Sequence, residues 1–139
     1  MNRKPLPLEA RIWERILRKK TDVFLRDDFG DLGGYDQVGR GLRNLTQKGR
    51  LLKIGFGIYT RAEKSPFDGR PVPLKGLPSL AAEALDRLGV ETGPSKFDRA
   101  YNTGTSTQVP TGRVIAVSRR VRRKIGFNGN YMSFEFAAS

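Results

Sequence analysis

The sequence contains neither cysteine nor histidine among its 139 residues. Without cysteine there is no disulfide framework, and without either residue type a Cys/His zinc site is excluded. The lack of histidine also excludes Ser-His-Asp and Cys-His catalytic sites. No segment approaches the roughly 18 consecutive apolar residues of a membrane span, and the first residues carry no signal-peptide pattern. These absences predict a cytoplasmic protein without a metal or other cofactor and without membrane attachment.

Acidic residues are scarce relative to basic ones. The chain has 26 Lys and Arg against 14 Asp and Glu, a formal net charge of +12. The excess is spread along the chain, since residues 1–61 hold 14 basic and 7 acidic residues and the remainder holds 12 and 7. A folded protein this positive attracts polyanions, of which nucleic acid is the commonest. The charge therefore favours a nucleic-acid partner, with solubility alone as the alternative.

The hydrophobic pattern of the first 62 residues begins with a helix, a short strand and a short helix. One helix face is formed by apolar residues at helical spacing, namely Leu8, Ile12, Trp13, Ile16 and Leu17. Val23–Leu25 is a short β-prone run. Asp27 is expected to cap a brief helix that carries Phe29 and Leu32 and ends at Gly33–Gly34.

A longer helix is predicted from Tyr35 to Lys48, with Gly49 at its end. Its inward face is aliphatic and consists of Val38, Leu42 and Leu45. Gly39 and Gly41 are unfavourable there, since each costs a helix interior about 1 kcal/mol relative to alanine. Either the helix begins later, or the glycines allow the second helix to pack closely, which is the interpretation we prefer.

Two β-prone runs, residues 50–54 and 58–61, flank Gly55-Phe56-Gly57 and predict a hairpin. Helix, strand, short helix, longer helix and hairpin is the order of a winged helix-turn-helix. The predicted fold class is therefore α+β, with a winged helix-turn-helix DNA-binding domain over residues 1–62. A connection rich in proline and glycine follows over residues 63–78.

A small α+β domain of one helix and antiparallel strands is predicted over residues 79–139. Ser79 is expected to cap its helix, which Gly89 ends. Strands are expected at 114–117, 124–127 and 130–136, and Asn128-Gly129 predicts a type I′ turn between the last two. Alternation in the last strand predicts one buried face, formed by Met132, Phe134 and Phe136.

The candidate DNA-binding residues lie on the outward face of the longer helix, because the second helix of a helix-turn-helix enters the major groove. Arg pairs with guanine edges, and Asn or Gln with adenine edges. A merely solvated face is the alternative, although one acid among many cations and amides favours DNA. The face consists of Tyr35, Asp36, Gln37, Arg40, Arg43, Asn44, Gln47 and Lys48.

The hairpin adds Arg50, Lys53 and Arg61 as candidate contacts to phosphates or a minor groove. A second basic patch consists of Arg119, Arg120, Arg122, Arg123 and Lys124. Three interpretations of this patch stay open: a charged edge strand that prevents aggregation, a second phosphate-binding surface, or a contact for an acidic partner.

Catalytic signals are weak. Asp27, Asp28 and Asp31 cluster, but on a short helix their first role is capping. Gly55-Phe56-Gly57 is not a phosphate-binding loop, because no helix with Lys-Ser/Thr follows it. We therefore expect no enzymatic activity.

Two stretches resemble AbiEi-type antitoxins of type IV toxin–antitoxin (abortive-infection) systems. Residues 36–45, 48–51 and 55–59 resemble the family's N-terminal winged-helix domain. The stretch from Asn102 to Pro110, NTGTSTQVP, is similar to the second half of the family and is the more specific match. The resemblance implies a bacterial transcriptional repressor that binds its own promoter, as an antitoxin to a nucleotidyltransferase-like toxin, with a homodimer on DNA left open.

Two alternatives remain at this point. One is a protein-interaction module whose basic second half docks an acidic toxin, with DNA binding incidental. The other is an RNA-binding protein that uses the segment from Arg119 to Lys124 together with Tyr131.

Overall fold

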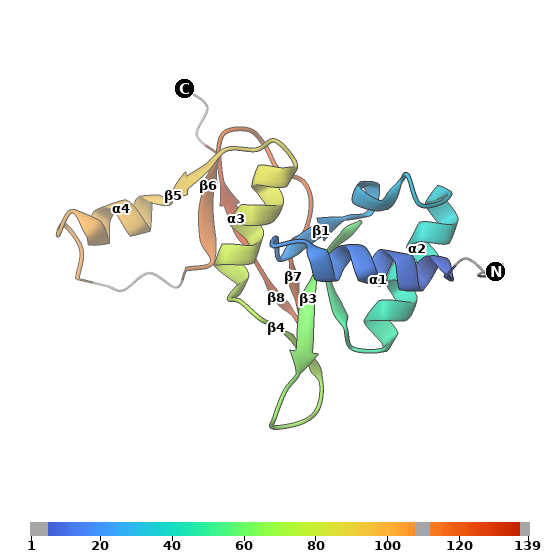
Figure 1. The fold of residues 1–139 in the computed structure, drawn as a ribbon. Coiled ribbons are helices and arrows are strands. Elements are labelled where there is room, and N and C mark those ends of the chain that lie inside the picture. The colour runs from blue at the N-terminus through green and yellow to red at the C-terminus, as the bar shows by residue number, and fades with distance from the viewer. Residues whose placement is uncertain (1–5, 108–111, 137–139) are drawn as a thin grey trace. The chain divides into compact units, whose positions relative to one another are not determined.

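The computed structural model describes residues 6–107 and 112–136, which form a mixed α+β fold with mainly antiparallel sheets (Figure 1). This confirms the predicted α+β class. The chain divides into two compact units, which we call the first unit (Met1–Lys53 and Gly57–Leu74) and the second unit (Ile54–Phe56 and Lys75–Ser139). The boundary after Leu74 falls inside the predicted connection over residues 63–78.

The elements up to β4 follow the predicted order and belong to the first unit, except that the last two residues of β2 are counted with the second unit. They are α1 (Leu8–Arg18), β1 (Val23–Leu25), the 3-10 helix η1 (Arg26–Phe29), α2 (Tyr35–Gln47), β2 (Leu51–Gly55), β3 (Ile58–Lys64) and β4 (Pro71–Pro73). The strand order is β1-β3-β2, with β4 paired to β3 as well. β1 runs antiparallel to β3 with Val23 opposite Thr60, and β4 runs antiparallel to the end of β3 with Ala62 opposite Pro73.

Two details of the predicted first helices are wrong. The second helix is a single 3-10 turn, and the Leu25 N–H donates to the carboxylate of Asp28 at 2.9 Å, so that Asp28 and not Asp27 holds its start. Leu17 is 59% exposed, although Ile12 and Ile16 are fully buried. Leu17 follows Ile16 by about 100° around the helix axis, which turns it away from the core.

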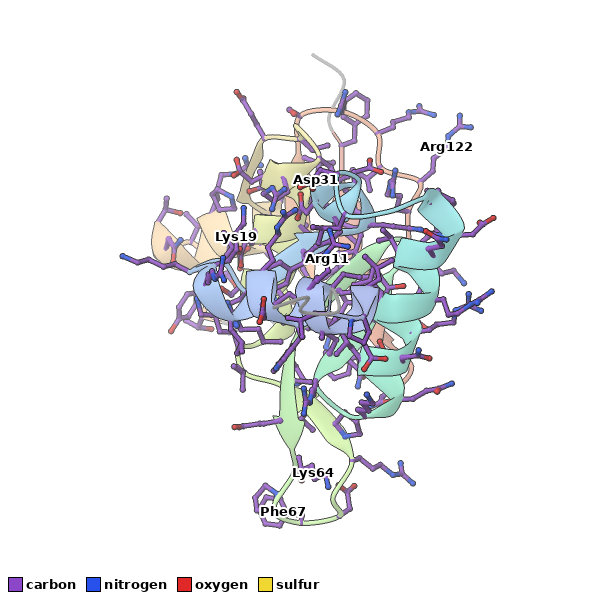
Figure 2. All side chains as sticks on the ribbon, turned by 45° about the vertical axis from the view of Figure 1, so that its right-hand side comes forward. Arg11, Lys19, Asp31, Lys64, Phe67 and Arg122 are labelled. Atoms are coloured by element: carbon purple, nitrogen blue, oxygen red, sulfur yellow. The ribbon has the colours of Figure 1, made fainter. Side chains whose placement is uncertain are left out.

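β4 lies within the segment that we predicted as an extended connection. Pro71 and Pro73 lack N–H groups, which an edge strand tolerates. The loop that joins β3 to β4 is closed by the Ser65 N–H, which donates to the Arg70 carbonyl at 2.8 Å. Figure 2 shows Lys64 and Phe67 toward the far end of this hairpin, and Phe67 is 96% exposed.

The core of the first unit forms where α1 and α2 meet the sheet. Its buried members are Ile12, Ile16, Phe24, Phe29, Val38, Leu42, Leu45, Leu51 and Tyr59. Gly41 allows the two helices to approach, since a Cβ there would lie 2.9 Å from Cδ1 of Ile12. A Cβ at Gly39 would overlap the guanidinium of Arg26 in η1. Close packing is therefore the better interpretation, but only Gly39 faces the predicted second helix, whereas Gly41 faces α1; α2 does begin at Tyr35.

The second unit contains α3 (Leu77–Arg87), β5 (Thr92–Pro94), α4 (Lys96–Asn102), β6 (Val114–Val117), β7 (Gly126–Phe127), β8 (Asn130–Tyr131) and β9 (Ser133–Glu135). One sheet has the order β5-β6-β9, and β7 pairs with β8. β9 runs parallel to β6, with Phe134 opposite Ile115, so the prediction of purely antiparallel strands is wrong for this pair. Buried side chains include Leu80, Leu85, Val117, Ile125 and Met132.

Several local predictions for the second unit need correction. α3 begins at Leu77 after Gly76, so Ser79 lies inside the helix and does not cap it. Neither β5 nor α4 was predicted; the Ser95 hydroxyl caps α4 by accepting from the Asp98 N–H at 3.1 Å. The predicted strand over 124–127 is reduced to β7.

The predicted last strand is divided between β8 and β9. Its expected buried face is incomplete, because Met132 is buried and Phe134 half-buried, whereas Phe136 is 39% exposed. The turn before it is as predicted, since Asn128 and Gly129 have φ values of 51° and 78°. Gly89, with φ 79°, follows the end of α3, also as predicted.

An ion pair joins α1 to the loop after η1 and predicts an acid-sensitive step. Arg15 donates to both carboxylate oxygens of Asp31, at 2.5 and 2.8 Å, and this lowers the pKa of Asp31 to about 2. A depressed carboxyl pKa stabilises the fold above the unfolded-state value and loses that contribution as the pH falls toward 2. The effect is small, because Asp31 is exposed to solvent.

We expect Asp31→Asn to flatten the decrease in urea midpoint between about pH 4 and pH 2. Arg15→Gln should flatten this decrease to a similar extent, because the Asp31 carboxylate then lacks the guanidinium that lowers its pKa. Urea unfolding followed by circular dichroism at half-unit pH steps measures this. Identical acid profiles for the wild type and both variants would contradict the assignment.

Candidate nucleic-acid interface

The outward face of α2 gathers the side chains that were predicted from helical spacing. All eight residues from Tyr35 to Lys48 in that prediction are exposed except Asn44, which is half-buried. On the opposite face, Val38, Leu42 and Leu45 are at most 1% exposed. The aliphatic face thus anchors the helix in the core, and the cations and amides point to solvent.

Arg26 from η1 braces the N-terminal end of this face. Its guanidinium lies 3.4 Å from the centre of the Tyr35 ring, and its Nε donates to the Tyr35 carbonyl oxygen at 3.1 Å. It also lies 3.9 Å from the Asp36 carboxylate. Oε1 of Gln37 accepts from the Gly34 N–H at 3.3 Å. The contacts of Tyr35, Asp36 and Gln37 therefore stabilise the N-terminal end of α2, and their side chains also form part of its exposed face.

Glu9 from α1 organises the other end. Its carboxylate accepts a hydrogen bond from Nζ of Lys48 and a further one from the Asn44 side chain. The hydrogen bond from Lys48 is the main reason why the pKa of Glu9 is lowered. Asn44 and Lys48, both predicted as DNA contacts, are thus oriented by a side chain that the sequence analysis did not single out.

An open hollow of about 510 Å³ lies along the start of α1 and the exposed face of α2. Gln37, Arg40 and Asn44 line it from α2, and Gly41 forms part of its wall. Three of the predicted base-contacting residues therefore border an open space beside α1.

Arg50 and Lys53 are exposed in the segment that follows α2 in the chain. The Arg50 guanidinium lies 5.0 Å from the centre of the Trp13 ring, which restrains its otherwise mobile side chain. Lys53 is on β2. Both cations are accessible to a phosphate backbone.

Arg61 is placed differently from the prediction. Its side chain is only 19% exposed, and its Nη2 donates to the Ile16 carbonyl at 2.5 Å and to that of Lys19. Its Nε donates to the Thr21 carbonyl at 3.2 Å. Arg61 therefore satisfies the carbonyls at the end of α1, and we exclude it from the interface.

The second basic patch lies in the second unit, between β6 and β7. All five of its cations are exposed, but the segment that carries them is irregular and not a strand. The edge-strand interpretation is therefore wrong.

Comparison with known proteins adds no relative. The sequence matches no model of a protein family, and no curated protein or solved structure is significantly similar to it. In the resembling stretch NTGTSTQVP, Gln108 to Pro110 lie outside the described residues. Within the described part, no helix is long and apolar enough to cross a membrane. Residues 6–107 and 112–136 also contain no group of three or more acidic, His or Cys residues that could hold a metal ion.

Proposed function

We propose that the first unit is a winged helix-turn-helix that binds duplex DNA sequence-specifically, with α2 in the major groove. The observation that carries this proposal is the division of α2 into a buried aliphatic face and an exposed face with Arg40, Arg43 and Gln47. Exposed Arg and Gln on one helix face match the donors and acceptors of base edges. The face also carries more cations than acids, as binding to phosphates requires.

The order of elements supports the same proposal. A helix, a strand, a one-turn helix and a longer helix are followed by a hairpin, and the strands lie in the order β1-β3-β2. In this arrangement, η1 and α2 are the two helices of the helix-turn-helix, and the β2–β3 hairpin is the wing. Arg50 and Lys53 would then contact phosphates on the flank of the groove, which fixes the register of α2 on the duplex.

The resemblance to AbiEi-type antitoxins suggests the biological role. A member of that family would repress its own operon, and its partner gene would encode a nucleotidyltransferase-like toxin. We therefore propose a transcriptional repressor whose operator lies in its own promoter, without a catalytic activity of its own.

Selection from a random duplex library tests the proposal directly. At about 0.15 M salt, the protein should enrich one motif and bind it about 10³-fold or more tightly than random duplex. The promoter fragment upstream of its gene should contain that motif. Equal affinity for all duplexes would contradict sequence-specific recognition and show that charge alone accounts for the binding. Tighter binding of matched RNA at the same salt concentration would favour the RNA-binding alternative.

A further inference from the structure

A basic hollow in the second unit has a role that DNA binding by α2 does not explain. It has a volume of about 390 Å³ and lies at the end of α3, against the segment between β6 and β7. The lining consists of aliphatic and arginine side chains only: Leu85, Leu88, Val90, Arg119, Arg120, Val121, Arg122 and Arg123.

The apolar part of this hollow is built on the core of the second unit. Leu85 is fully buried and Val90 is 6% exposed, whereas Leu88 and Val121 are half-buried. Leu85 and Val90 therefore support the floor from the core, and the accessible aliphatic surface of the depression comes mainly from Leu88 and Val121. A hollow of this size can hold one large apolar side chain.

The arginines around the hollow are partly preorganised. Nη2 of Arg119 donates to the Leu88 carbonyl at 2.9 Å, which ties the segment to the end of α3. The Arg120 guanidinium lies 5.9 Å from the centre of the Phe136 ring. Arg122 extends away from the ribbon into solvent (Figure 2). A ligand therefore meets two arginines with restricted directions, Arg119 and Arg120, and a third, Arg122, whose side chain is free to reorient toward it.

Cations far outnumber acids in the segment that carries the arginines of the hollow, although Asp86 and Glu91 are sequence neighbours of its other lining residues. Residues 112–136 contain six cations, Arg113 among them, and a single acid, Glu135. Glu135 is engaged elsewhere, because it accepts from the Lys96 N–H at 3.1 Å and lies 3.6 Å from Arg99. Closely spaced arginines repel one another, and a bound anion relieves that repulsion.

We propose that this hollow binds an acidic segment of a partner protein, with one large apolar side chain seated on the aliphatic floor between Asp or Glu residues. The arginines would pair with the carboxylates, for which a guanidinium has the matching fork of donors. The floor favours an acidic polypeptide, because an aliphatic side chain beside carboxylates matches both the apolar and the ionic part of the hollow, whereas phosphate groups alone match only the ionic part. An apolar centre with a polar, charged rim is the usual composition of a protein interface.

Labelled peptides test the proposal with the full chain. The probe is a twelve-residue peptide with a central leucine flanked by glutamates; one control has serine in place of the leucine, and another has glutamine in place of each glutamate. Fluorescence polarisation at about 0.15 M salt should give at least about tenfold weaker binding for each control, since each lacks the apolar or the ionic part. Amide chemical shifts on peptide addition should change at Leu88 and over residues 119–123.

Matched double variants separate this site from the proposed DNA-binding face. Arg120→Ala with Arg122→Ala should weaken peptide binding about tenfold or more, and Arg40→Ala with Arg43→Ala, which removes the same charge, should leave it unchanged. Unchanged thermal unfolding would show that the exposed replacements leave the fold intact.

Three results would overturn the proposal. They are equal binding of the serine peptide, no binding of the leucine probe at about 1 mM, and displacement of that probe from these residues by a random oligonucleotide. None of them bears on DNA recognition by α2.

Discussion

Replacing Arg40 and Arg43 together by alanine is expected to abolish the preference of the protein for its selected duplex over random DNA. Both side chains are exposed on α2, and Arg40 lines the hollow beside α1. A good arginine–guanine pair discriminates by about 1–3 kcal/mol. Two such contacts sum to about 2–6 kcal/mol, or roughly 30-fold to 10⁴-fold in the affinity ratio.

Fluorescence anisotropy with the selected and the random duplex at one salt concentration measures this ratio. The matched control is Arg18→Ala with Lys20→Ala, which removes the same charge from exposed positions at and after the end of α1. The control should weaken binding to both duplexes alike and leave the ratio unchanged. Retention of the full ratio in the Arg40 and Arg43 variant would show that α2 does not read the sequence.

Arg61→Ala is expected to destabilise the first unit by about 2–3 kcal/mol, because a largely buried charged donor of several hydrogen bonds is removed. The carbonyls of Ile16 and Thr21 each lose a hydrogen bond, and the Asp22 carboxylate, which lies 4.0 Å from Nε, loses one ion-pair partner. The guanidinium also lies 5.2 Å from the centre of the Phe24 ring, so packing is lost as well. Lysine should recover only part of the loss, since its single nitrogen cannot reach these acceptors in the same way.

Urea unfolding at neutral pH measures this change in the free energy of unfolding. Arg43→Ala serves as the control, because Arg43 is exposed and replacement of an exposed side chain should change stability by at most about 0.5 kcal/mol. At temperatures where the Arg61 variant is folded, its preference for the selected duplex should equal that of the wild type. If the Arg61 variant were as stable as the wild type but had lost its preference for the selected duplex, Arg61 would be a DNA contact and not a structural residue.

The contrast between these arginines explains which parts of the site could be predicted. Helical spacing assigned Arg40 and Arg43 to the solvent side of α2, because the positions of Val38, Leu42 and Leu45 determine the buried face. Spacing along β3 carries no such information on Arg61. Its environment is the end of α1, more than forty residues away in the sequence.

Glu9 and Arg26 also show that sequence patterns do not reveal contacts between distant segments. Neither belongs to a recognisable pattern, yet each contacts residues of α2 that the sequence analysis selected. The only local signal was the pair Gly39 and Gly41. It indicated correctly that something approaches α2 closely, but the sequence could not identify the Arg26 guanidinium and the Ile12 side chain as the groups that do so.

The amino-acid order by itself determined the features that depend on neighbours along the chain: the amphipathic α1 and α2, the turn at Asn128-Gly129, the positive charge and the missing chemistry of cysteine and histidine. Only the tertiary structure decided which cations remain available to a ligand, that β9 joins β6 in parallel, and that an aliphatic floor lies beneath the arginines from 119 to 123. The reason is that periodicity and turn preferences act over a few residues, whereas these features arise between segments that folding brings together across long separations.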